Sequence, residues 1–162
     1  MARWLTAEEQ ASWRAWIAAS TLLPERLSRD LVDEGGMTLA DYELLMYLSE
    51  APGRRLRMSD LAAATLSSRS RLSHQVDRLA DSGLVAREPC SDDRRGAFAV
   101  LTDAGWDTVV ETAPLHVESV RRRLVDVLTP EEFAELGRLC SVIAERLRDA
   151  DPDLCDGGQS GG

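Results

Sequence analysis

Lysine is absent from this sequence of 162 residues, and arginine supplies all 19 of its basic side chains. A P-loop needs a lysine on the nucleotide phosphates and Schiff-base catalysis needs a lysine amine, so both are excluded. The two histidines and three cysteines show no Cys-x-x-Cys pair and no other metal-ligand spacing. We therefore expect no metal, no cofactor and no disulfide framework, and free cysteines suit a reducing compartment.

Long hydrophobic runs are also missing, since the longest uninterrupted apolar stretches have five residues. A membrane-spanning helix needs about 20 apolar residues, and the first residues contain no apolar signal-peptide core. Hydrophobic residues make up 44% and charged residues 29%, which is typical of a globular domain with or without an attached subdomain. We expect a cytoplasmic protein without a membrane partner.

The net charge of −9 is distributed unevenly along the chain. Residues 54–95 carry nine arginines against six acids, a net charge of +3, while the rest of the chain carries −12. A DNA-facing surface on an acidic body would show this distribution. A chance cluster of solvated arginines would show it too, so charge alone leaves both interpretations open.

Start and stop signals predict two helices in the first third of the chain. Thr6 and Glu9 form a capping box at the start of a long helix that Gly35-Gly36 ends. Pro24 lies inside this helix and is expected to kink or split it, because proline removes one backbone hydrogen bond. A second helix begins after Thr38 and ends at Pro52-Gly53.

The middle of the chain predicts two short helices and then a β-hairpin. A compact helix over residues 59–64 is followed by one with Ser67 as its N-cap, and Gly83 ends the second. Residues 84–90 and 97–101 are two short strands around a polar loop. The hairpin offers an edge position for Pro89. The core face of the second helix is Leu72, Val76 and Leu79.

The last third of the chain predicts two further helices. Thr102 caps a long helix with Pro114 as a second kink, and Thr129 with Glu132 starts the last helix. Residues 149–162 have the composition of a disordered tail. The last helix is expected to bury four apolar side chains: Leu136, Leu139, Ile143 and Leu147.

Helix, tight turn, helix and an arginine-bearing hairpin form the winged helix-turn-helix layout. The most specific motif is Asp93-x-Arg95 followed by Leu101-Thr102-x-x-Gly105. With Leu61-Ala62 and Gly83-Leu84-Val85, the sequence resembles the MarR family of bacterial transcriptional regulators. The resemblance covers roughly residues 5–148.

This resemblance implies a mainly α fold with a small β-hairpin wing. A winged helix-turn-helix DNA-binding domain would span residues 37–102, and residues 5–36 and 103–148 would form a helical dimerisation region. Apolar stripes on helices at both ends of the chain independently favour a homodimer. Two recognition helices about one DNA turn apart imply a pseudo-palindromic operator in double-stranded DNA.

The predicted recognition helix turns polar side chains away from its core face. We expect base contacts from Arg69, Arg71 and His74, because an α-helix fits the major groove and its N-terminal half reaches base edges. Phosphate or water-mediated contacts are expected from Ser67, Ser68, Ser70, Gln75 and Arg78. Asp77 is expected to pair with an arginine.

In the hairpin loop, the resemblance implies that Arg95 enters the flanking minor groove, with Arg94 beside it and Asp93 holding the loop. Solvated turn residues are the alternative interpretation of these three side chains.

Family members commonly carry an effector crevice between the dimerisation helices and the winged helix. Five side chains could line it here: Trp13, Trp16, Tyr42, Trp106 and His116. Arg14 or Arg26 could meet an anion, so a small aromatic or anionic effector is implied; ordinary core or dimer packing is the alternative. Cys90, close in sequence to Arg87 and Arg94, could be a redox switch, and a passive cysteine is the alternative.

The resemblance favours a repressor, since most of the family are repressors. No nucleophile elbow, nucleotide loop or catalytic carboxylate pair is present, so we expect no enzyme. Two alternatives remain: a winged helix used for protein interaction, and a sensor that has lost DNA binding. The first predicts an outward helix face without arginine.

Overall fold

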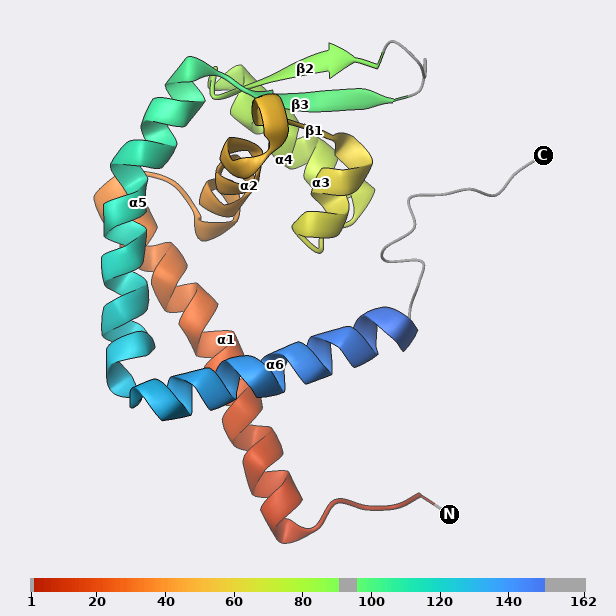
Figure 1. The fold of residues 1–162 in the computed structure, drawn as a ribbon, viewed down its shortest axis with the longest axis vertical. Helices are drawn as coiled ribbons and strands as arrows, with labels where there is room; N and C mark the ends of the chain where they lie inside the picture. The colour runs from red at the N-terminus through yellow and green to blue at the C-terminus, as the bar shows by residue number, and fades with distance from the viewer. Residues whose placement is uncertain (1, 91–95, 151–162) are drawn as a thin grey trace, which may run out of the picture.

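The structure is a computed structural model that describes residues 2–90 and 96–150. Within these ranges the chain is mainly helical, with one small antiparallel sheet (Figure 1). The elements in chain order are α1 (Ala7–Gly35), α2 (Leu39–Glu50), η1 (Pro52–Arg54), β1 (Arg55–Arg57), α3 (Met58–Ala64), α4 (Arg69–Asp81), β2 (Val85–Pro89), β3 (Ala97–Leu101), α5 (Asp103–Arg123), η2 (Val125–Val127) and α6 (Pro130–Ala150). The fold expected from the sequence is confirmed.

The predicted helix starts are formed by reciprocal side-chain caps. At α1 the Thr6 amide donates to Glu9 Oε2 (2.8 Å) and the Glu9 amide donates to Thr6 Oγ1 (3.2 Å). Thr129 and Glu132 repeat this arrangement at α6, with the same two distances. Each box satisfies two backbone amides that a helix start leaves without an intrahelical partner.

Neither internal proline splits its helix, and the kinks expected at Pro24 and Pro114 stay predictions. Pro24 lies inside α1, a single helix of 29 residues, and Pro114 lies inside α5, a single helix of 21 residues. Each proline leaves the carbonyl four residues earlier without its usual donor. Those carbonyls belong to exposed Ser20 and Val110, where water can supply the missing hydrogen bond.

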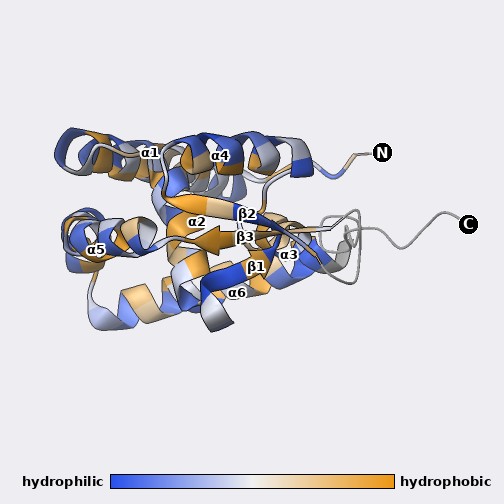
Figure 2. Ribbon diagram, turned by 90° about the horizontal axis from the view of Figure 1, so that it is seen from above, coloured by the Kyte–Doolittle hydropathy of each residue, from blue (hydrophilic) through white to orange (hydrophobic). Residues whose placement is uncertain are grey.

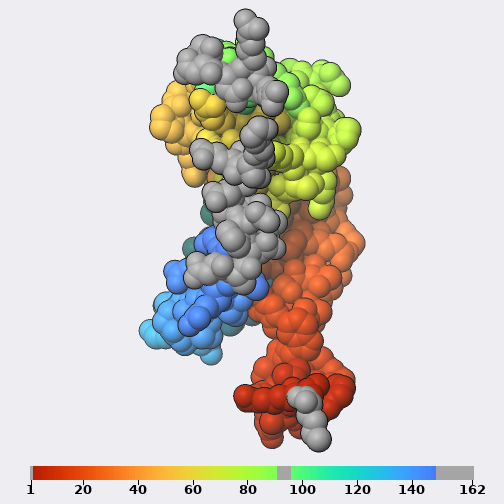
Figure 3. Space-filling model, turned by 90° about the vertical axis from the view of Figure 1, so that its right-hand side faces the viewer, coloured from red at the N-terminus to blue at the C-terminus, as the bar shows by residue number. Residues whose placement is uncertain are grey.

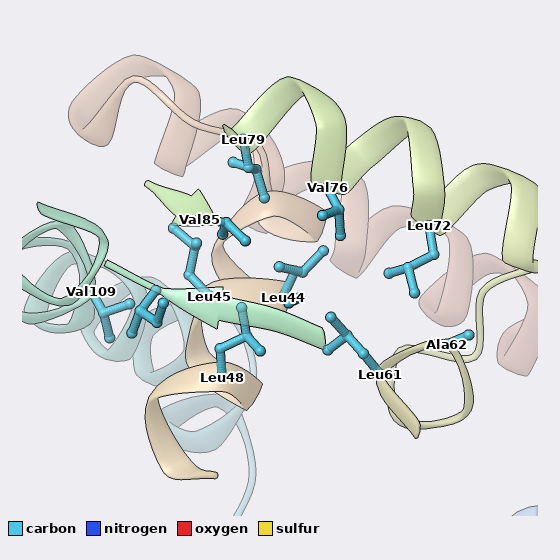
Figure 4. Close-up of a cluster of buried hydrophobic side chains, with 12 residues drawn as sticks. Leu44, Leu45, Leu48, Leu61, Ala62, Leu72, Val76, Leu79, Val85 and Val109 are labelled. Atoms are coloured by element: carbon cyan, nitrogen blue, oxygen red, sulfur yellow. The ribbon is translucent and has the colours of Figure 1, made fainter. Parts of the chain in front are cut away.

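A hydrophobic core lies between α2, α3, α4 and the sheet (Figure 4). Seen from above, the apolar strand β3 and helix α2 occupy the middle of the molecule (Figure 2). The α4 face predicted from helical spacing, Leu72, Val76 and Leu79, is at most 5% exposed and points into this core. This burial fixes which side of α4 faces outward.

The wing is a three-stranded sheet in the order β1-β3-β2, not the two-stranded hairpin that was expected. β1 has only three residues, too few to show a period of two, and β3 supplies its hydrogen-bond partners. Leu56 of β1 faces Ala99 of β3 in the register. Pro89 lies on β2, an edge strand, as predicted.

α1 and α5 are joined by one carboxylate with three polar partners. Arg123 of α5 donates to both oxygens of Asp30 on α1, from Nε and from Nη2, at 2.6 Å each. Arg122 donates to Asp30 Oδ2 at 3.1 Å, and the Ser119 hydroxyl also donates to this carboxylate. The bonds from Arg123, then Ser119 and Arg122, hold the pKa of Asp30 well below its usual value of 3.8.

Replacing Asp30 by asparagine is expected to lower the free energy of unfolding by about 1–3 kcal/mol at pH 7, measured by urea denaturation. A depressed carboxyl pKa stabilises the fold fully above the unfolded value, and this stabilisation is lost as the pH falls toward the folded value. The difference between wild type and Asp30→Asn should therefore shrink below about pH 4. Glu25→Gln, which breaks the exposed pair with Arg29, is the control and should cost about 0.5 kcal/mol. Equal effects of the two substitutions would contradict the prediction.

α6 does not bury the four apolar side chains expected of it. Leu139 and Ile143 are each 46% exposed, Leu147 is 64% exposed, and Leu136 is half-buried. The helix leaves the end of α5 and makes only sparse contacts with other described elements (Figure 1). It continues to Ala150, so the rest of the predicted tail lies outside the described residues. None of the described helices combines the length and apolar character needed to cross a membrane.

Candidate nucleic-acid interface

The turn between α3 and α4 fixes where α4 begins. Leu66 adopts a positive φ of 50°, and the Ser67 amide donates to the Ala62 carbonyl at 3.0 Å. The N-cap of α4 is Ser68, whose hydroxyl accepts from the Arg71 amide at 3.3 Å. The predicted cap, Ser67, is therefore wrong by one residue, since its hydroxyl donates instead to the Thr65 carbonyl.

The first half of α4 presents free polar side chains to solvent. Arg69, Ser70, Arg71 and His74 are all exposed. Among the described residues, no carboxylate forms an ion pair with Arg69 or Arg71. Two unpaired guanidinium groups thus project from the end of the helix where backbone amides and the helix dipole already favour an anion.

The second half of α4 is tied to the start of α2. Gln75 Nε2 donates to the Ala40 carbonyl (2.8 Å) and to Asp41 Oδ1 (3.1 Å). Arg78 Nη2 donates to the same Asp41 oxygen at 2.7 Å. Two side chains predicted as phosphate ligands therefore hold the helix in place, through an aspartate that is 7% exposed.

A second tie joins α4 to the sheet. Arg87 on β2 pairs with Asp77 Oδ1 at 2.9 Å, which confirms that Asp77 pairs with an arginine. The same guanidinium donates to Ser73 Oγ (2.9 Å) and to the Ser73 carbonyl (3.1 Å). α4 is thus held from both sides, by Asp41 of α2 and by Arg87 of β2.

Sequence patterns did not identify Asp41 and Arg87 as positioning residues. Asp41 is the third residue of a capped helix, and Arg87 is a single arginine in a short strand. Their partners lie 37 and 10 residues away in the sequence. No local periodicity links positions separated by an intervening helix or turn.

Replacing Asp41 by alanine is expected to loosen α4 and to lower the ratio of specific to non-specific DNA affinity several-fold. The substitution leaves Arg78 without its acceptor and removes one of two acceptors of Gln75, at a cost of about 1–2 kcal/mol in stability. Fluorescence anisotropy on preferred and scrambled duplexes measures the ratio, and urea denaturation measures the stability. Asp81→Ala, at the exposed end of the same helix, is the charge-matched control. An unchanged ratio in Asp41→Ala would show that this aspartate does not position the helix for DNA.

The wing residues Asp93, Arg94 and Arg95 lie outside the described part of the chain. The base of the wing is described: the Cys90 amide donates to the Gly96 carbonyl at 3.0 Å. The Cys90 side chain is a free thiol and is 5% exposed. Its burial limits access by an oxidant.

Arginines 54, 55 and 57 are largely engaged in contacts within the chain. Arg54 stacks on Trp106 (4.1 Å to the ring centroid) and pairs with Asp103 at 3.2 Å. Arg55 stacks on Phe98, 3.9 Å from the ring centroid, and pairs with Glu88. The Arg57 guanidinium lies 5.4 Å from the centroid of the same ring. Three of the nine arginines in residues 54–95 therefore contact aromatic rings of β3 and α5.

The five predicted crevice residues are not brought together in the described chain. Tyr42 and His116 are in contact, with ring centroids 4.8 Å apart. Burial lowers the pKa of His116, whose buried Nδ1 has no hydrogen-bond partner among the described residues. Burial, and then the charge of Glu50, raises the pKa of Tyr42.

The three tryptophans lie elsewhere. Trp106 packs beside the core under Arg54. Trp13 and Trp16 are 54% and 41% exposed, on the N-terminal turns of α1 that project from the rest of the molecule (Figure 3). Of the two arginines expected to meet an anion, Arg26 lines a surface hollow with the end of α5. No cluster of three or more potential metal ligands occurs in the described residues.

The sheet, the core and the exposed arginine-bearing helix define a winged-helix protein. Comparison with known proteins identifies the family. The profile of the MarR family matches residues 35–96. PecS from Dickeya dadantii (strain 3937), an HTH-type transcriptional regulator, is 32% identical over 92 residues, which are 55% of this chain and 53% of PecS. The chain thus spans about half the length of that curated relative.

Two solved structures extend the similarity over almost the whole chain. AbsC, a MarR family regulator from Streptomyces coelicolor, is 51% identical with a TM-score of 0.86, covering 91% of this chain and 99% of AbsC. Sco3205 from the same organism, crystallised in complex with DNA, is 49% identical with a TM-score of 0.88, covering 91% and 92%. The chain belongs to the MarR family, whose members are transcriptional regulators and not enzymes.

Proposed function

We propose that this regulator is a homodimeric repressor that reads a pseudo-palindromic operator with the N-terminal half of α4. The observation that carries the proposal is that the two halves of this helix differ in their contacts. Arg69, Arg71 and His74 are exposed and Arg69 and Arg71 have no ion-pair partner among the described residues, whereas Gln75 and Arg78 are bonded to α2. Arginine pairs with the edge of guanine through two hydrogen bonds, so Arg69 and Arg71 are the proposed base readers.

Neighbouring serines are the proposed phosphate ligands. Ser68 and Ser70 are exposed on the first turn of α4, and Ser67 lies half-buried in the turn before it. Hydroxyl groups and backbone amides at a helix start fix the register of a protein on DNA without reading sequence. Gln75 and Arg78, which are bonded to α2, are proposed to position the helix in addition to their predicted phosphate or water-mediated contacts. Asp93, Arg94 and Arg95 remain the proposed wing contacts with the minor groove.

The proposed homodimer rests on apolar side chains that the single chain leaves uncovered. α6 exposes Leu139, Val142, Ile143 and Leu147 to between 46% and 64%. α1 exposes Trp13 and further apolar residues toward its N-terminus. Contiguous apolar faces of this kind mark association surfaces, and a two-fold dimer is the commonest closed solution.

A small ligand is the proposed releasing signal. The Bordetella bronchiseptica regulator BpsR, 19% identical with a TM-score of 0.73, is described as regulated in its DNA binding by 6-hydroxynicotinic acid. The burial of Cys90 supports a small ligand over an oxidant. Tyr42 and His116, which meet between α2 and α5, remain candidates for an effector crevice in the dimer.

Selection of duplexes from random DNA, followed by fluorescence anisotropy at several salt concentrations, tests the proposal. The selected sequence should be a pseudo-palindrome bound about 10³-fold or more tightly than a scrambled duplex, with affinity falling steeply as salt rises. Sedimentation should give one dimer per duplex. A pool that shows no enrichment after repeated rounds would contradict DNA reading and favour a winged helix that binds protein.

A further inference from the structure

Leu66, in the turn between α3 and α4, is an apolar side chain left in water. It is 74% exposed, and within the described part of residues 37–102 it is the one large hydrophobic side chain that is exposed. The other exposed large hydrophobic side chains of the described chain lie before residue 37 or after residue 102. They fall on the segments proposed to form the dimer, so those apolar faces do not account for Leu66.

The backbone at Leu66 also disfavours leucine. α3 ends in a Schellman motif, in which the Ser67 amide donates to the Ala62 carbonyl (3.0 Å) and the Leu66 amide donates to the Ala63 carbonyl (3.3 Å). Leu66 holds the left-handed position of this motif, with a φ of 50°. Glycine is the usual residue there, because a Cβ is crowded in that conformation. Folding therefore favours glycine at this position, and the leucine side chain adds nothing to the core.

The turn places Leu66 next to the end of α4 that carries the two unpaired arginines. Leu66 lies two residues before Ser68, the N-cap of α4, and three residues before the exposed Arg69. The N-terminal end of a recognition helix is the part that reaches base edges in the major groove. An apolar side chain cannot bind a phosphate or accept a hydrogen bond. The apolar group that a base presents in the major groove is the 5-methyl group of thymine.

We propose that Leu66 contacts the 5-methyl group of one thymine in each half-site of the operator. The inference rests on the proposed function, because it requires that the start of α4 enters the major groove. The contact removes the leucine side chain and the methyl group from water together. It selects thymine at one position beside the bases assigned to Arg69 and Arg71, and it accounts for a leucine kept at a strained, exposed position.

Replacing single thymines of the selected duplex by uracil tests the contact, because uracil differs from thymine only in lacking the methyl group. Fluorescence anisotropy should reveal one thymine position whose replacement weakens wild-type binding about fourfold, the effect of one buried methyl group. Replacement in both half-sites together should weaken binding about 15-fold. In Leu66→Gly and Leu66→Asn the double replacement should change the affinity less than about twofold. Leu66→Met keeps an apolar side chain and should retain most of the uracil effect.

The stability of Leu66→Gly separates a DNA contact from a structural role. Glycine adopts the left-handed conformation without strain, so the urea midpoint of this variant should be unchanged or higher than that of wild type. Its affinity for the thymine duplex should nevertheless fall. A lower urea midpoint would show that Leu66 stabilises the fold and would contradict the proposal.

Four further results would overturn the proposal. The first two are an absence of any uracil-sensitive position in wild type and an equal uracil effect in wild type and Leu66→Gly. The third is an equal loss of affinity of Leu66→Gly on thymine and uracil duplexes, which would place the side chain against deoxyribose. The fourth is dissociation of the Leu66→Gly dimer in sedimentation, which would show that the second copy covers Leu66.

Failure of this contact and failure of the proposed function give different results. A selection that enriches no sequence removes operator reading and the thymine contact together. An enriched operator that wild type binds equally well with uracil removes only the contact of Leu66 and leaves the arginines as the proposed readers.

Discussion

Replacing Arg71 by alanine is expected to weaken binding to the selected DNA sequence by about 1–3 kcal/mol, a loss of roughly 5- to 150-fold. Arg71 is exposed on the first turn of α4 and forms an ion pair with no described carboxylate. Its guanidinium is therefore available to bind a base edge. The Arg71 backbone amide donates to the Ser68 hydroxyl, and this capping hydrogen bond does not depend on the Arg71 side chain. Because the contact is to a base, the preference at one position in each half-site should relax.

Anisotropy titrations on the selected duplex and on variants with single base changes measure both effects. Arg29→Ala removes an equal charge from exposed α1 and should change affinity little, apart from a small salt-dependent shift. If Arg71→Ala weakens binding equally on every sequence and lowers the salt slope by about one, Arg71 contacts a phosphate. The base-reading role would then pass to Arg69 or His74.

Replacing Gly105 by alanine is expected to destabilise the fold by about 3 kcal/mol, in the upper range for overpacking a rigid site. A Cβ at this position would lie 2.2 Å from the Leu84 carbonyl oxygen and 2.6 Å from Leu101 Cδ1. The carbonyl cannot easily move, because it accepts from the Thr102 amide (3.1 Å) and the Thr102 hydroxyl (3.0 Å). This junction joins the start of β2, the end of β3 and the first turn of α5.

Urea denaturation of Gly105→Ala measures this cost, with Gly137→Ala as the matched control. Gly137 lies within α6, and a Cβ there would meet nothing within 4 Å. In a helix interior alanine is favoured over glycine by about 0.5–1 kcal/mol, so the control should be neutral or more stable. Similar stabilities of the two variants would show that the α5 start can shift away from the sheet.

The same junction explains why Leu101-Thr102-x-x-Gly105 is a specific motif. Thr102 caps α5 by accepting from the Gly105 amide at 3.0 Å, and it also donates to the Gly83 carbonyl at 2.8 Å. The motif therefore locks the long helix α5 onto the base of the wing. The same sheet also contacts α4, because Arg87 of β2 pairs with Asp77.

The sequence by itself determined the features that depend on neighbours within one or two helical turns. Capping at Thr6, Thr102 and Thr129 is satisfied by residues three positions away, so local pattern was sufficient. The buried face of α4 also followed from its spacing, since burial of every third or fourth residue is a property of one helix. The exposed face, with Arg69 and Arg71, followed as its complement.

Only the tertiary structure decided which polar side chains are bonded within the chain and which are left without a described partner. Asp41 engages Gln75 and Arg78, Arg87 engages Asp77, and β3 recruits β1 as a third strand. Each of these contacts joins segments brought together by the burial of the shared core, so no local period encodes it. Periodicity also predicted an apolar face on α6. Only the tertiary structure showed that this face is exposed in the single chain, because no described element covers it.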